Sequence, residues 1–329
     1  HMLALPLPDK RENLLYLRPV RLRRKRRKMS YTKKKLEDLN VIDDFLMNRL
    51  ASDTAVGEEF CRLLLSTLLQ REIGKVKVTV QKVIPPLAPD RKGIRMDVRV
   101  EEPTNIREKA GAAAMNLNGM NVYDIEPHLL KSADTGLPRH NRFYQALTDA
   151  SRMKSGQRDY RALPDLYVLT ILDKDPFGYD YMTYSIRNKC EEIEELEYGD
   201  GLRFYYFYTK GRLGGNEGMK TMLRYIGDSR KENALDEATK KLHMFAESVK
   251  IQPEVRESYM LWEDYEEMMR EAGEMNARIE TVFDFLQGKG EIPQTVTERI
   301  KTETNPQILG KWVMLAAKAD SVADFAAKI

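Results

Sequence analysis

The stretch NVYDIEPHLL, residues 121–130, places three polar side chains at every second position: Asp124, Glu126 and His128. In a β-strand successive side chains point to opposite faces of the sheet, so these three would share one face while Tyr123 and Ile125 point to the other. Such a face is either the solvated side of an amphipathic strand or a set of ligands for a metal ion. The segments around it bear on this choice.

The segments before this stretch predict helices followed by strands. Apolar residues at helical spacing indicate helices near residues 36–50 and 54–71. The period then changes from 3.6 to 2 in KVKVTVQKVI, residues 75–84, and in GIRMDVRVEE, residues 93–102, which indicates two half-buried strands.

The second of these strands carries the acid that matters most. Strict alternation places its apolar side chains on one face, namely Ile94, Met96, Val98 and Val100. Asp97 would lie on the other face, between Arg95 and Arg99. The Asn-Gly pair in NLNG, residues 116–119, is typical of a tight turn, so the next strand is expected to fold back beside this one. Asp97 and Glu126 would then face each other.

The segments after it predict a mixed α/β fold. A helix is expected near residues 141–153, followed by the apolar run DLYVLTILD, residues 165–173, which is typical of a strand covered on both faces. Further strands are expected at residues 179–187 and 203–211, and the chain then reads as helical from residue 217 onward. The order is therefore helix, three strands, helix, strand.

Composition favours a globular protein that works in the cytoplasm. Of 329 residues 42% are hydrophobic and 32% charged, and no apolar run approaches the ~18 residues of a membrane span. We therefore expect a soluble protein with no membrane partner. Two distant cysteines, Cys61 and Cys190, form no disulfide framework or zinc motif, which favours a reducing compartment.

The two carboxylates predict a magnesium site. Mg²⁺ prefers hard oxygen ligands and is commonly held by one or two carboxylates together with waters and substrate phosphates. Asp97 and Glu126 would supply the two carboxylates, and the carbonyl of Ile125 would add a third oxygen. A metal so held, Mg²⁺ or Mn²⁺, neutralises phosphate charge and lowers the pKa of a bound water.

Six segments between residues 40 and 273 occur in an order that matches one group of nucleases: DRKGIRMDVRVEE, VYDIE, RHNRFYQALTDASRMKSGQRDYRALPDLYVLTILDKDPFG, RNKCEE, YGDGLRFYYFYTKG and ESYMLWEDYEEMMREAG. Together they resemble the PD-(D/E)XK nuclease family transposase, or Rpn-like recombination-promoting nuclease, group. The resemblance implies a restriction-endonuclease-like αβββαβ core, a mixed sheet flanked by helices. It also implies metal-dependent cleavage of DNA in recombination, transposition or defence, with RNA not excluded as a substrate.

The resemblance also assigns roles to single residues. Asp97 matches the first catalytic acid of the family and Glu126 the second, while His128 stands where the family has Gln or Lys. Glu59 falls in the first-helix region where many members place an accessory acid. Asp124 is interpreted as an exposed residue or a neighbour of the ligands, not as a ligand itself.

A basic group is expected to contact the nucleic acid. The resemblance places Arg139, Arg142 and Tyr144 at the start of the helix that follows the active-site strand, where they would contact phosphate or support the site. Arg95, which flanks Asp97, is predicted to join them.

The chain is expected to have three parts. Residues 1–28 carry ten Lys and Arg against two acids, whereas the rest of the chain carries 44 against 49. Such a cluster would suit nucleic acid. We interpret it instead as a tag-derived or non-native, disordered leader, because its first two residues resemble a cloning remnant and Met29 opens a native-like start. Residues 29–215 would then form the nuclease-like domain and residues 216–329 a helical C-terminal region.

Two features depart from the family pattern. The insertion REKAGAAAMNLNG, residues 107–119, lengthens the connection between the two acids. Pro127 and His128 replace the usual end of the Glu-X-Lys or Glu-X-Gln motif, and because proline cannot donate a ladder hydrogen bond, the strand must end, bulge or lie at an edge there. The alternative function is therefore a catalytically decayed nuclease fold that binds nucleic acid or protein. The sequence leaves the oligomeric state open.

Overall fold

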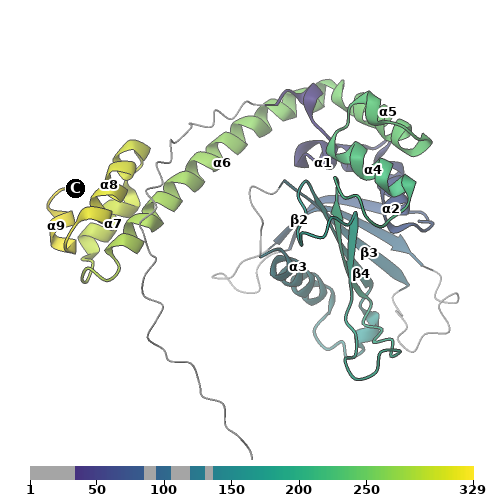
Figure 1. Cartoon of the computed structure of the whole chain (residues 1–329), viewed down its shortest axis with the longest axis horizontal. Helices are drawn as coiled ribbons and strands as arrows, with labels where there is room; N and C mark the ends of the chain where they lie inside the picture. Colours follow the sequence, from purple (N-terminus) through teal and green to yellow (C-terminus); the bar gives the residue numbers. More distant parts are fainter. Residues whose placement is uncertain (1–33, 85–93, 105–118, 130–135) are drawn as a thin grey trace, which may run out of the picture. The chain divides into compact units, whose positions relative to one another are not determined.

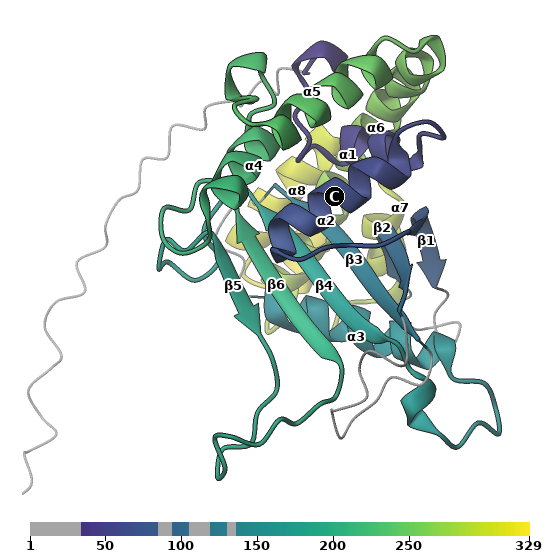
Figure 2. The ribbon, with the colours of Figure 1, turned by 90° about the vertical axis from the view of Figure 1, so that its right-hand side faces the viewer.

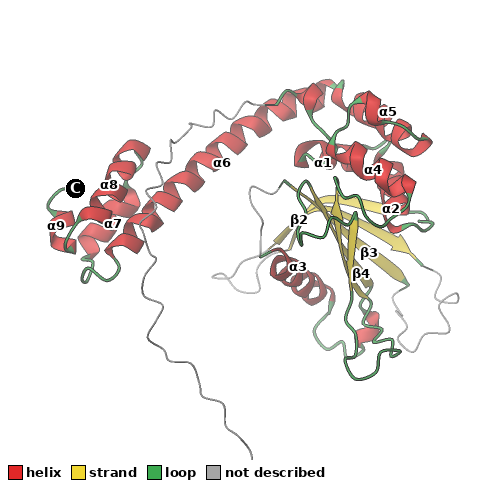
Figure 3. Ribbon diagram, viewed as in Figure 1, coloured by secondary structure: helices red, strands yellow, loops and turns green. Residues whose placement is uncertain are grey.

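The structure, a computed structural model, describes residues 34–84, 94–104, 119–129 and 136–329, with no account of the side chains of residues 263–270. The expected leader, residues 1–28, and nearly all of the expected insertion at residues 107–119 lie outside the described residues. The described part is a mixed α/β fold built on a six-stranded mixed sheet with helices on both faces (Figure 3).

The sheet has the strand order β1-β2-β3-β4-β6-β5. Its strands are β1 (Lys77–Ile84), β2 (Ile94–Pro103), β3 (Met120–His128), β4 (Asp165–Leu172), β5 (Thr183–Ile186) and β6 (Leu202–Tyr208). The first three strands pair antiparallel, β3 and β4 and then β4 and β6 pair parallel, and the short edge strand β5 runs antiparallel to β6. The predicted order of helix, three strands, helix and strand is confirmed.

Helices cover the two faces of this sheet unequally. On one side lie α1 (Asp44–Ser52), α2 (Gly57–Leu69), α4 (Glu217–Gly227) and α5 (Glu237–Lys250), and on the other side lies α3 (Leu137–Arg152) (Figures 1 and 2). The remaining helices are α6 (Pro253–Leu286), α7 (Gln294–Thr302), α8 (Pro306–Lys318) and α9 (Val322–Ala326). None of the helices in the described part of the chain combines the length and apolar composition needed to cross a membrane.

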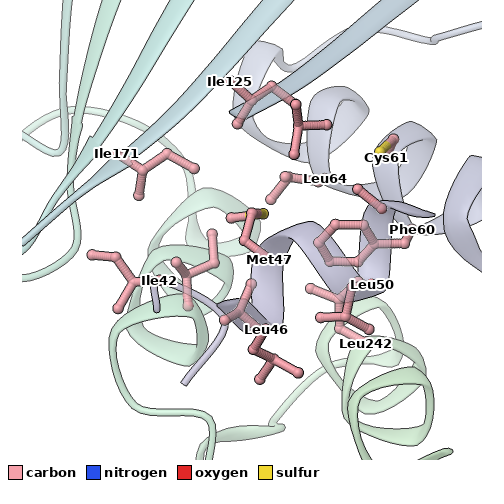
Figure 4. Close-up of a cluster of buried hydrophobic side chains, with 14 of the residues drawn as sticks. Ile42, Leu46, Met47, Leu50, Phe60, Cys61, Leu64, Ile125, Ile171 and Leu242 are labelled. Atoms are coloured by element: carbon pink, nitrogen blue, oxygen red, sulfur yellow. The ribbon is translucent and has the colours of Figure 1, made fainter. Parts of the chain in front are cut away.

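The main hydrophobic core lies between the sheet and the larger helical layer. Met47 of α1 and Leu64 of α2 are fully buried together with Ile125 of β3 and Ile171 of β4, and Leu242 of α5 belongs to the same cluster (Figure 4). The core therefore extends past residue 215, where the sequence suggested a boundary, because α4 and α5 complete it. A second cluster joins the end of α6, including Val282 and Leu286, to α7, α8 and α9.

The strand β2 changes the face of its apolar side chains at Asp97, and here the predicted alternation is wrong. Val98 and Val100 lie in the main core, whereas Met96 packs with Leu147 of α3 on the opposite face of the sheet. The register between β1 and β2 passes from Val80 opposite Val98 to Lys82 opposite Met96 with no pair between them. The unpaired β1 residue, Gln81, has a left-handed backbone with φ of 50°. This local break turns both strands over.

Candidate functional site

The fold brings Asp97, Asp124 and Glu126 together on the α3 face of the sheet, and we call these three residues the acid cluster. Arg99 lies opposite Asp124 in the register of β2 and β3, which places Asp97 beside Glu126. The backbone N–H of Asp97 donates a hydrogen bond to Glu126 Oε1 at 3.1 Å. The break in β2 makes this contact possible, because Asp97 has no strand partner in either register.

The acid cluster is enclosed, which excludes the simple reading of a solvated strand face. Asp124 is fully buried and Glu126 is 4% exposed, while Asp97 is half-buried. No hydrogen bond of normal geometry reaches either carboxyl oxygen of Asp124. Buried polar groups are almost always hydrogen-bonded in folded proteins, so a carboxyl group without such bonds marks a functional position. The expectation that Asp124 is an exposed residue is wrong, because α3 covers this face.

Burial and mutual repulsion raise the pKa of all three acids. Desolvation, and then the charge of Asp97, raise the pKa of Asp124 to about 7, against a smaller opposing effect of Arg99. Burial and the charges of Asp124 and Asp97 raise the pKa of Glu126 well above its ordinary value. Burial also raises the pKa of Asp97, although Arg95 and the contact with Glu126 lower it in part. Three carboxylates with raised pKa values are characteristic of a site that takes a cation.

The end of β3 is shaped by Pro127. The pairing of β3 with β2 stops at Ile125 opposite Val98, whereas its parallel pairing with β4 continues through Pro127 to His128. Because proline has no N–H, it is tolerated where one neighbour has already left the ladder. The prediction that the ladder is interrupted at Pro127 is confirmed on the side of β2. There the carboxylate of Glu126 takes the Asp97 N–H.

Aromatic rings from α3 line the same side of the cluster. The rings of His128 and His140 are perpendicular with centroids 5.6 Å apart, and His140 stacks obliquely on Tyr144 at 4.2 Å. Burial and the charges of the acid cluster raise the pKa of Tyr144 to about 12. Its phenol therefore stays protonated at neutral pH, as a hydrogen-bond donor near the acids.

A polar pair continues the site across the sheet. Thr170 of β4 lies opposite Glu126 in the parallel register, and the side-chain amide of Asn141 on α3 donates to Thr170 Oγ1 at 2.8 Å. Both residues are buried. Sequence reasoning missed Asn141, Thr170 and His140, because a lone polar residue in a helix or an apolar strand carries no signal until the fold pairs it.

Other predicted residues lie elsewhere. Glu59 on α2 stands on the opposite helical layer and forms ion pairs with Arg62 at 2.6 Å and Lys241 at 2.7 Å, so the structure does not bring it to the acid cluster. Ile125 buries its side chain in the main core and is paired in register with β2 and β4, which leaves its carbonyl within the sheet.

The predicted basic group is only partly assembled. Arg95 is exposed, yet close enough to Asp97 to lower the pKa of that acid. Arg139 and Arg142 are exposed on the first turns of α3. Tyr144 is the one member of this group that lies against the acid cluster.

The donors fit a hard divalent cation without forming a complete cage. Among the residues that the structure describes, no three His, Cys, Asp or Glu side chains are grouped so as to hold a metal ion. Mg²⁺ does not require such a group, because it keeps several waters and commonly uses one or two carboxylates. Two carboxylates in contact beside a third without normal hydrogen bonds satisfy this chemistry, so the residues present fit the ion.

Comparison with known proteins gives no relative for this chain. No family model, no curated protein and no solved structure matches it. The case for a function rests on the geometry of the acid cluster and its surroundings.

Proposed function

We propose that the protein is a metal-dependent endonuclease that hydrolyses DNA phosphodiester bonds with Mg²⁺ or Mn²⁺, in recombination, transposition or defence. The proposal takes the αβββα core and the following strand as a PD-(D/E)XK nuclease core. The observed order α1, α2, β1, β2, β3, α3, β4 supports it, together with a mixed sheet and acids on adjacent central strands.

The acid cluster is the observation that carries the proposal. Burying several carboxylates next to one another is costly in a metal-free protein, because each charge loses its hydration and repels the others. A structural role would be served better by apolar residues of similar size. The cost is understandable if Asp97 and Glu126 bind a metal ion and Asp124 adjusts the charge of the site.

The surrounding residues would prepare the site for a phosphodiester. A divalent ion bound there supplies a water of lowered pKa and neutralises phosphate charge. Asp97 and Glu126 would hold the ion. His128 and Tyr144 present a ring nitrogen and a phenol on the same face as the acids, able to donate hydrogen bonds to a phosphate oxygen. Asn141 and Thr170 hold α3 against the sheet and keep bulk water away from Glu126.

Digestion of plasmid DNA in Mg²⁺ or Mn²⁺ tests the proposal. Asp97→Asn and Glu126→Gln remove one ligand charge each while preserving shape, and each should lower cleavage by more than ~100-fold. Glu59→Gln is the matched control, because it removes one carboxylate from the other helical layer and should leave cleavage unchanged.

Two results would count against the site. Cleavage that survives both substitutions would place the chemistry elsewhere, and no metal-dependent cleavage by the parent protein would favour a decayed nuclease fold that only binds. Digestion of RNA beside DNA, under the same conditions, identifies the substrate.

A further inference from the structure

A basic cleft lies on the α3 face of the sheet beside the acid cluster. It has a volume of about 300 Å³ and lies between β1, β2 and the last turn of α3. Four of its lining side chains are cationic, Lys77, Lys82, Arg99 and Arg152, and one is acidic, Glu101. We refer to this group as the basic cleft.

The charges within the basic cleft do not balance. Glu101 Oε1 accepts hydrogen bonds from Arg99 Nη2 at 3.0 Å and from Arg152 Nη2 at 2.6 Å. This carboxylate offsets one of the four cations. Neither Lys77 nor Lys82 forms an ion pair with a described residue, and Arg152 Nε is buried without a hydrogen-bond partner. An anion entering the cleft would find positive charge and donors in excess.

Ordinary structural reasons explain only part of this arrangement. Arg152 stands in the last turn of α3, where the helix dipole alone favours a cation. That reason does not apply to Lys77 and Lys82, which project from a strand. Both lysines are exposed, so neither is needed for the core.

The basic cleft and the acid cluster share strand β2. Arg99 lies opposite Asp124 in the register, and its charge acts against the raised pKa of that acid. Arg99 and Glu101 follow Asp97 by two and four positions, which is ~7 and ~13 Å along a strand. A nucleic-acid strand rises ~3.4 Å per nucleotide, so these distances correspond to about two to four nucleotides.

We propose that the basic cleft binds a backbone phosphate of the nucleic-acid strand, about two to four nucleotides from the bond that is cut. This proposal rests on the proposed function for the identity of the ligand. Arginine and lysine together suit phosphate, since Arg99 and Arg152 present planar forks and the two lysines add mobile point charges. The cleft would fix the register of the strand relative to the acid cluster.

Binding measured without a divalent metal tests the cleft separately from cleavage. Fluorescence anisotropy of a labelled single-stranded oligonucleotide in EDTA compares the full chain with its Lys77→Gln/Lys82→Gln variant. The affinity should fall about tenfold, and the slope of log K against log salt should decrease by about two. The control is Lys301→Gln/Lys311→Gln, which makes the same charge change at exposed positions on α7 and α8 and should have little effect.

The source of the phosphate is separated by two further arms. Equal affinity for oligonucleotides with a 5′-phosphate and with a 5′-hydroxyl would support binding of an internal backbone phosphate. Competition by inorganic phosphate with no effect of the lysine substitutions on oligonucleotide binding would overturn the nucleic-acid assignment.

The remaining outcomes separate the two proposals. Equal losses in the cleft variant and its control would reduce the effect to bulk charge and overturn the cleft. If the parent chain fails to cleave but its binding still depends on Lys77 and Lys82, the cleft stands and the nuclease proposal fails.

Discussion

Asp124 is the most enclosed member of the acid cluster, with no exposed surface and no normal hydrogen bond to its carboxyl oxygens. Its pKa of about 7 follows from that burial and from the neighbouring charge of Asp97. At neutral pH the metal-free cluster therefore carries bound protons that an exposed trio of acids would have lost. Proton release and metal binding become linked at this position.

Stability of the metal-free protein should change with pH in a direction set by Asp124. Its carboxyl pKa is higher in the folded state than in the unfolded chain, so its favourable contribution is complete below about pH 4 and is lost as pH rises through about 7. Asp124→Asn cannot ionise and avoids that loss. We expect it to raise the free energy of unfolding at pH 8 by on the order of 2–4 kcal/mol and to change it little at pH 4.

Urea unfolding in EDTA at the two pH values measures this difference. Glu59→Gln, a surface carboxylate substitution, is the control and should shift stability by less than ~1 kcal/mol at either pH. A stabilising effect of Asp124→Asn that is equal at pH 4 and pH 8 would contradict the raised pKa.

Metal affinity should rise with pH over the same range. Because Asp124 and Glu126 have raised pKa values, a cation must displace protons from the cluster near neutral pH. We expect Mn²⁺ to bind more tightly at pH 8 than at pH 6, by about tenfold for each proton displaced. Calorimetric titration at both pH values measures this, and an affinity independent of pH would be inconsistent with protonated acids in the metal-free site.

At the scale of elements, the decisive feature is the point where β1 and β2 exchange faces. Gln81 adopts a left-handed backbone on β1, and the facing Asp97 on β2 is free of both strand registers. Alternation of side chains is a property of regular strands, and a break of this kind ends it. The break lets Met96 pack under α3 while Val98 remains in the main core.

Substitutions at Gln81 should reveal the cost of this break. Gln81 is exposed, so its side chain adds little packing, and Gln81→Val would force a β-branched residue into the left-handed region. We expect a loss of about 1–2 kcal/mol in the free energy of unfolding, measured by chemical denaturation. Gln81→Gly, which relieves the same strain but loosens the unfolded chain, should stay within ~1 kcal/mol of the parent. A tolerated valine would argue against the left-handed conformation.

At the scale of the whole molecule, one core joins segments far apart in the chain. The N–H of Ile42 donates to the carbonyl of Ile226 at 3.1 Å, and the N–H of Val41 donates to Ser229 Oγ at 2.8 Å. Helices α4 and α5 add large buried side chains to the cluster formed by α1, α2 and the sheet, among them Met222, Leu223, Tyr225, Ile226 and Leu242. The sheet with its first three helices is therefore an incomplete folding unit.

Truncation after residue 215 should prevent cooperative folding. Such a chain loses several fully buried side chains, each worth roughly 2–5 kcal/mol when truncated to alanine, and the sum exceeds the stability of a typical domain. A chain ending at residue 262 keeps α4, α5 and the start of α6 and should unfold in one cooperative transition. Circular dichroism during thermal unfolding compares the two, and a folded chain ending at residue 215 would refute the role given to α4 and α5.

Much of the fold could be predicted from periodicity, because a strand or helix buried on one face repeats its apolar residues at a fixed interval. The strands carrying Asp97 and Glu126, the turn between them and the helix after them were all predicted close to their observed positions. The face exchange at Asp97 was not, since a left-handed residue such as Gln81 has no signature in composition. The burial of Asp124 was missed for a related reason, because the cover comes from α3.

The sequence by itself determined the order of elements, the opposing faces of β3 and the nearness of Asp97 to Glu126, since these depend on local periodicity and on one tight turn. Only the tertiary structure decided that the acids are buried, that Glu59 stands apart on the other helical layer, and that Lys77, Lys82, Arg99 and Arg152 surround one cleft. These features depend on which helix covers which face of the sheet and on contacts between residues distant in sequence. Solvent exclusion and charge accumulation arise from such packing, and both set the chemistry of the site.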